Sequence, residues 1–102
     1  MALPIAGLHH LALRTTDLER AKQFYTQTLG FSPVFEAEGV IIVDAGGTPL
    51  GLRDADAQTP ASDRFNPYRV GLDHLALTVP DVASLEDLKR HLRCGRRAQQ
   101  RD

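Results

Sequence analysis

The chain has 102 residues, of which 42% are hydrophobic and 25% charged, a balance typical of one ordinary globular domain. Its net charge of −1 argues against a nucleic-acid partner, and its apolar runs fall far short of the ~20 residues that span a membrane. A single cysteine excludes a disulfide framework and a cysteine-based zinc site. Because the sequence also lacks a signal-like start, a cytoplasmic location is predicted.

The first predicted element is a strand within residues 8–14, where the side chains alternate. Alternation places Leu11 and Leu13 on one face, suited to packing against a helix, and His10 on the other. The face of His10 carries small and polar residues, which suit the wall of a cavity. His9 has the opposite parity and is expected under the helix or exposed, outside that cavity.

A helix is predicted next, because Thr16 and Glu19 have the spacing of a capping box and Gly30 supplies a stop. Asp17 is interpreted as a residue that begins the helix near its positive end. The apolar stripe of this helix comprises Leu18, Ala21, Phe24 or Tyr25, and Leu29.

Three short strands are predicted after the helix, at residues 32–37, 39–44 and 48–53, with glycines at the turns between them. The first unit is therefore expected to have the order β-α-β-β-β. The polar stretch 54–70 contains two prolines and is interpreted as a linker.

A repeat follows the linker. Residues 71–82 (GLDHLALTVPDV) match residues 7–18 (GLHHLALRTTDL) at seven of twelve positions, at an offset of 64 residues. The chain is therefore predicted to contain two copies of one unit. The second copy is expected to open with a strand too, on which His74 occupies the position that His10 has in the first.

The helix of the second copy is predicted to begin at Ser84 and to stop at Gly95, with Asp81 near its positive end, as Asp17 is in the first copy. Half of the 12 basic residues lie in the last 14 positions. This basic tail has neither the alternation of a strand nor the interleaved aromatic residues of a nucleic-acid site. The second copy is thus expected to break off after its helix.

The sequence resembles the vicinal oxygen chelate superfamily, which contains glyoxalase I, bleomycin- and fosfomycin-resistance proteins and extradiol dioxygenases. The residues that carry the resemblance are His10 to Leu18, Phe24-Tyr25, Leu29-Gly30-Phe31 and His74 to Asp81. The resemblance implies an α+β fold of paired βαβββ modules, the second truncated after its helix. The corresponding segments are a first module at 1–53, a linker at 54–70, the start of a second module at 71–92 and a non-homologous basic tail at 93–102.

The same resemblance implies a divalent metal, Fe, Mn, Ni or Zn, held by His10 and His74 from the first strands of the two modules. An acidic ligand in some relatives comes from the last strand of the first module. The aligned position in this chain is Gly51, which has no side chain to donate. In other relatives the acid comes from a strand that would follow the end of this sequence.

Three functions remain open at this point. The first is a metal-dependent lyase or dioxygenase, lactoylglutathione lyase-like or dioxygenase-like, that acts on a small substrate with vicinal oxygens. The second is a metal-free protein of the resistance type that binds a small molecule, which Gly51 favours. The third is a truncated, inactive product. Under each of them a homodimer is expected, with neither nucleic acid nor membrane as a partner.

Overall fold

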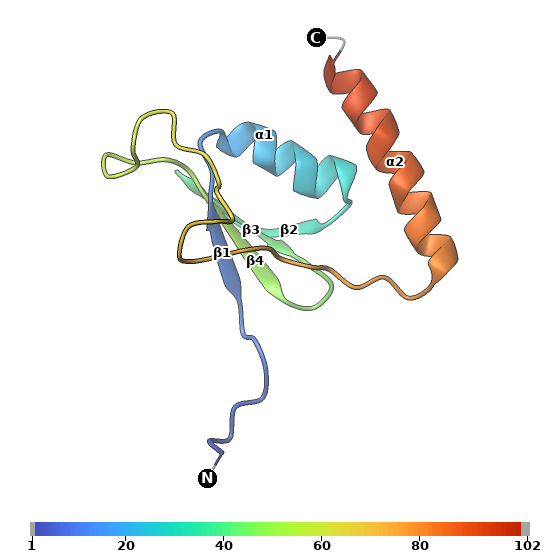
Figure 1. Ribbon diagram of the computed structural model, residues 1–102, viewed down its shortest axis with the longest axis horizontal. Coiled ribbons are helices and arrows are strands. Elements are labelled where there is room, and N and C mark those ends of the chain that lie inside the picture. The colour runs from blue at the N-terminus through green and yellow to red at the C-terminus, as the bar shows by residue number, and fades with distance from the viewer. Residues whose placement is uncertain (1, 101–102) are drawn as a thin grey trace. The chain divides into compact units, whose positions relative to one another are not determined.

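The computed structural model describes residues 2–100, with side chains for residues 2–93. The chain divides into two compact units, residues 1–63 and residues 64–102. The elements of unit 1 are β1 (Leu11–Arg14), α1 (Leu18–Gln23), η1 (Phe24–Thr28), β2 (Ser32–Ala37), β3 (Val40–Asp44) and β4 (Pro49–Arg53), and unit 2 contains α2 (Val82–Gln100) (Figure 1).

Unit 1 is built on a four-stranded mixed sheet with the strand order β1-β4-β3-β2. β1 runs parallel to β4, whereas β4 with β3 and β3 with β2 form antiparallel pairs. Because a parallel pair cannot be joined by a tight hairpin, the chain passes through α1 and the two middle strands before β4 returns beside β1. This is the β-α-β-β-β order predicted from the sequence, and β2 to β4 lie within one residue of the predicted ranges.

The core of unit 1 lies between the sheet and the helix. Its fully buried side chains are Ile41 and Val43 of β3 and Leu50 and Leu52 of β4. Each pair is spaced by two residues, so one face of each strand faces the core. The residues that pack against this cluster are Leu11, Leu13, Leu18, Ala21, Tyr25, Phe31 and Ala45. The predicted packing of Leu11 and Leu13 on the helix side is therefore confirmed.

The first helix begins one residue later than its capping-box pattern predicted. Asp17 is the N-cap, and its Oδ1 accepts a hydrogen bond from the backbone N–H of Arg20 at 3.1 Å. The predicted cap, Thr16, is wrong because with Asp17 as N-cap the third helical residue is Arg20 rather than Glu19, so no capping box closes. The role assigned to Asp17, at the positive end of the helix, is confirmed.

The end of this helix widens into a π-helical turn, η1, which the sequence pattern did not predict. The N–H of Leu29 donates to the carbonyl of Phe24 at 2.9 Å, five residues back. Gly30, with φ of +76°, then ends the helix as predicted. The turn brings Tyr25 and Phe31 into a stacked pair, with ring centroids 6.3 Å apart.

Unit 2 departs from the expected second strand. Residues 72–79 form no strand, because no described residue pairs with them in a ladder. The apolar side chains of this segment remain partly in solvent, at exposed fractions of 44% for Leu72, 41% for Leu75 and 49% for Leu77. The alternating pattern thus survives in the sequence without the hydrogen-bonded neighbour that would turn it into a strand.

The helix of unit 2 begins at Val82, and Asp81 caps it by accepting a hydrogen bond from the N–H of Ser84 at 2.7 Å. The predicted cap at Ser84 is therefore wrong, whereas the placement of Asp81 at the helix start is confirmed. The predicted stop at Gly95 is wrong too, since α2 continues to Gln100. Side chains of the predicted basic tail after Arg93 lie outside the described residues.

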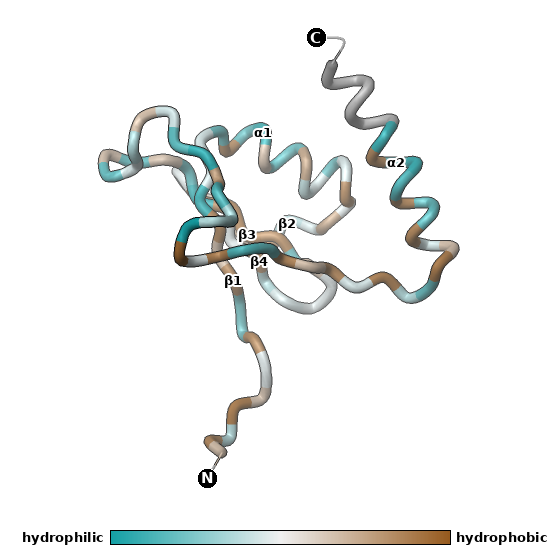
Figure 2. Tube along the Cα trace, in the orientation of Figure 1, coloured by the Kyte–Doolittle hydropathy of each residue, from teal (hydrophilic) through white to brown (hydrophobic). Residues whose placement is uncertain are grey.

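Apolar and polar residues alternate along the first half of α2, as the colouring of Figure 2 shows. Among the described residues, no helix combines the length and the apolar character needed to cross a membrane.

Candidate functional site

The sheet of unit 1 has a second face, opposite the core, which we call the open face. A concavity of about 410 Å³ lies against it. The residues that line this concavity are His9, His10, Ala12, Val34, Val40, Ile42, Pro49, Gly51 and Arg53. Most of the lining is apolar, and the polar groups belong to two imidazoles and one guanidinium.

The strand register fixes how these residues are arranged. Ala12 of β1 lies opposite Gly51 of β4, and Gly51 lies opposite Ile42 of β3. These three residues form an apolar row across the centre of the open face. The edge strand β2 adds Val34 at a β-bulge, where the register shifts between Pro33 and Phe35.

Gly51 forms the floor of the concavity. A Cβ atom placed on Gly51 would lie 3.6 Å from the Cβ of Ala12, an ordinary van der Waals distance, and its φ is not in the left-handed region. Neither backbone conformation nor close packing therefore requires glycine here. Its structural consequence is an open space in the middle of the sheet, at the position where some relatives are expected to carry an acidic ligand.

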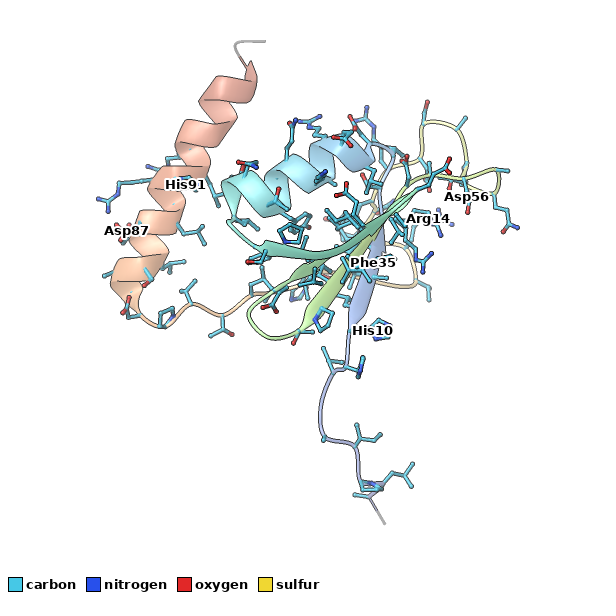
Figure 3. All side chains as sticks on the ribbon, turned by 180° about the vertical axis from the view of Figure 1, so that it is seen from behind. His10, Arg14, Phe35, Asp56, Asp87 and His91 are labelled. Atoms are coloured by element: carbon cyan, nitrogen blue, oxygen red, sulfur yellow. The ribbon has the colours of Figure 1, made fainter. Side chains whose placement is uncertain are left out.

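The two imidazoles stand at one end of the open face. His9 and His10 immediately precede β1, both are exposed, and their Nδ1 atoms are 2.8 Å apart. The predicted exclusion of His9 from the cavity is wrong, because strand alternation begins only at Leu11 and does not govern the two residues before it. Figure 3 shows His10 and Arg14 at opposite ends of β1.

The other predicted metal ligand, His74, belongs to unit 2 and lies in the segment that forms no strand. Its side chain is 80% exposed, and its Nδ1 is 2.8 Å from Oδ1 of Asp73. Among the described residues, no three histidine, cysteine, aspartate or glutamate side chains are grouped so as to hold a metal ion. The pairing of His10 with His74 stays a prediction, since the two residues belong to different units.

Two guanidinium groups stand at the far end of the open face. Arg14 and Arg53 are opposite each other in the parallel register of β1 and β4. The guanidinium of Arg14 is bound to the segment after β4: its Nη1 lies 3.3 Å from Oδ2 of Asp56 and donates to the carbonyl of Asp54 at 2.7 Å (Figure 3). A hydrogen bond from the backbone N–H of Gln58 is the largest effect that lowers the pKa of Asp56, and the charge of Arg14 lowers it further.

Arg53 is the functional candidate that sequence reasoning missed. The signal was present, because residues 49, 51 and 53 alternate with the buried leucines of the predicted strand 48–53. That parity places Arg53 on the same face as Gly51. The residues predicted from the sequence for this site were histidines, and this guanidinium was not among them.

Several solved structures are similar to this chain. A glyoxylase/bleomycin resistance protein/dioxygenase domain from Frankia sp. EAN1pec is 26% identical, with a TM-score of 0.75, and the match covers 89% of this chain and 70% of that one. A lactoylglutathione lyase from Agrobacterium tumefaciens is 25% identical, with a TM-score of 0.66 over 90% of this chain and 72% of that one.

A fosfomycin resistance protein from Listeria monocytogenes, 14% identical, shares the fold with a TM-score of 0.66 over 88% of this chain and 65% of that one. No curated protein gives a significant match. The family profile described as Glyoxalase/Bleomycin resistance protein/Dioxygenase superfamily matches residues 7–95. These findings confirm the α+β fold class that the resemblance implied, and the chain belongs to the Glyoxalase/Bleomycin resistance protein/Dioxygenase superfamily.

Proposed function

We propose that the chain binds a small organic molecule on the open face of unit 1, as a binding protein of the resistance type. The observation that carries this proposal is the concavity of about 410 Å³ with its mostly apolar lining. Pockets for small molecules are typically concave, apolar and of order 300–1,000 Å³, with a few polar groups that fix orientation. The concavity has each of these properties.

Gly51 supports binding without a protein-held metal as the main function. The acidic ligand expected from the last strand of the first module is absent at this position, and the space that its side chain would take is open. Apolar contact with Ala12 and Ile42 then supplies most of the binding free energy, at roughly 25 cal/mol per Å² of apolar surface removed from water.

The test compares ligand affinity in two variants with added methyl groups. Gly51→Val fills the floor of the concavity, whereas Ala61→Val adds bulk at an exposed turn after β4, outside its lining. Small apolar compounds that bind the full chain are first found by ligand-observed NMR and then measured by calorimetry. We expect Gly51→Val to abolish measurable binding and Ala61→Val to leave it unchanged. Equal affinity in all three proteins would refute binding on the open face.

A second candidate is the metal-dependent lyase or dioxygenase implied by the family. The observation that favours it is the repeat, which gives His10 and His74 equivalent positions 64 residues apart. The described residues do not make a complete metal centre, since no third donor is grouped with either imidazole. We therefore assign no reaction step to a metal, and the two-histidine site is a proposal about binding alone.

Metal binding is tested by titrating Zn²⁺, Ni²⁺ or Mn²⁺ into the full chain and into its His10→Ala and His74→Ala variants. His91→Ala is the matched control, because His91 is an exposed residue of α2. If both imidazoles bind one ion, each single variant weakens the affinity about tenfold or more, while the control does not change it. Unchanged affinity in both variants would remove this candidate.

A homodimer is the oligomeric state that we propose. Leu72, Leu75 and Leu77 leave an apolar segment partly in solvent, and burial of such surface favours association. Light scattering coupled to size exclusion gives the mass directly. A dimer is expected at micromolar concentration, and a monomer throughout would contradict it.

A further inference from the structure

Arg53 gives the open face a preference for negatively charged ligands, which the family resemblance does not imply. It is the last residue of β4 and lies opposite Val40 of β3 on one side and Arg14 of β1 on the other. Its side chain follows that of Gly51 on the same face, about 7 Å further along the strand. A guanidinium therefore stands beside the apolar floor of the concavity.

The charge of Arg53 is not neutralised within the described part of the chain. No described carboxylate lies within ion-pair distance of it, whereas Asp56 holds its neighbour Arg14 at 3.3 Å. Asp44, the acidic residue of β3, is paired with Pro49 at the opposite end of β4, and its Oδ1 accepts a hydrogen bond from the N–H of Gly47 at 2.7 Å. The open face thus keeps one uncompensated positive charge at its Arg53 end.

We propose that the ligand of the open face is a small anion: an aromatic or similarly apolar body that lies over Gly51, with a carboxylate that binds Arg53. A guanidinium presents parallel N–H donors that match the two oxygens of a carboxylate. The missing side chain at position 51 lets a flat ring approach the backbone between Ala12 and Ile42. This assignment rests on the proposed binding function and names its ligand class.

The probe pair 2-naphthoate and 2-naphthamide separates charge from shape. Both present the same apolar ring, but only the first carries a carboxylate. We expect the full chain to bind 2-naphthoate about threefold more tightly than the amide, because an ion pair with an exposed guanidinium provides a difference of this size. Arg53→Gln is expected to remove this preference and Arg53→Lys to keep part of it.

The matched control is Arg20→Gln, which removes the same charge from α1, on the other side of the sheet. Circular dichroism of each variant checks that the fold is kept. Equal affinity for acid and amide, or a preference that survives in Arg53→Gln, would overturn the anion assignment. If the wild-type chain binds 2-naphthamide and Gly51→Val abolishes that binding, the proposed function stands without the anion assignment. If the wild-type chain binds neither probe, the proposed function and the anion assignment both fail.

Discussion

Neighbouring residues of β4 lie on opposite faces of the sheet and have different roles. Leu50 and Leu52 are buried in the core, whereas Gly51 and Arg53 face the concavity. Because side chains alternate along a strand, the same five residues both hold the sheet to its helix and supply the candidate site. Substitutions at adjacent positions are therefore expected to separate stability from binding.

Gly51→Val is predicted to stabilise the fold while it blocks the site. A glycine within a strand costs roughly 0.5–1 kcal/mol relative to alanine, and valine has a high strand propensity. A Cβ atom at residue 51 has ordinary contacts, and the further methyl groups of valine would extend toward the concavity. Urea denaturation should show a higher free energy of unfolding than that of the wild type. A loss of stability would show that the backbone of β4 requires glycine at this point.

The N-cap of α1, Asp17, allows a second prediction about a single residue. Asp17→Ala removes the acceptor for the N–H of Arg20 and should lower the free energy of unfolding by about 1 kcal/mol. Glu19→Ala is the control, because Glu19 is exposed and closes no capping box. Denaturation curves that show equal losses for both variants would contradict the cap.

At the scale of elements, the sequence predicted the order and type of β1, α1, β2, β3 and β4 in unit 1. It did so because β3 is a run of β-branched residues, the two leucines of β4 alternate with Gly51 and Arg53, and glycines mark the turns. Two features escaped prediction for physical reasons. The π turn of η1 accompanies the stacking of Tyr25 and Phe31, a contact that residue spacing does not reveal, and the segment 72–79 carries a strand pattern without a partner strand among the described residues.

The packing of β4 against α1 yields a prediction for the elements. Leu52 is 1% exposed and contacts the core cluster, so Leu52→Ala should cost about 2–5 kcal/mol of stability. Val34 is 60% exposed on β2, and Val34→Ala should change stability by no more than about 0.5 kcal/mol. Urea denaturation of both variants measures the difference. Similar losses would mean that the core lies on the other face of the sheet.

For the whole molecule, the sequence repeat revealed the family and the position of His10, but it could not supply the concavity. The concavity depends on the β1–β4 register and on the bulge in β2, both of which are tertiary features. His9 became a lining residue only when those strands were placed, whereas Arg53 could have been found from the alternation along residues 48–53. A pattern in the sequence finds equivalent positions, whereas contact between residues distant in sequence needs the fold.

The pH dependence of stability follows from Asp56, which ties the loop after β4 to β1. Its pKa in the folded chain is lower than the ordinary value of 3.8, so the ionised form is favoured by folding. The contribution is complete above pH 3.8 and is lost as the pH falls through the lowered value. Urea midpoints measured at falling pH should therefore decline less in Asp56→Asn than in the wild type. Parallel declines would show that folding does not lower the pKa of Asp56, to which the hydrogen bond from the N–H of Gln58 contributes most and the charge of Arg14 less.

We propose above that the open face of the sheet in unit 1 binds the ligand. Backbone amide chemical shifts, followed while the full chain is titrated with its tightest small-molecule binder, test it most directly. We expect the largest shifts at Ala12, Ile42 and Gly51, which form the row across the concavity. Shifts confined to α1, η1 or α2, with the open face unchanged, would contradict it.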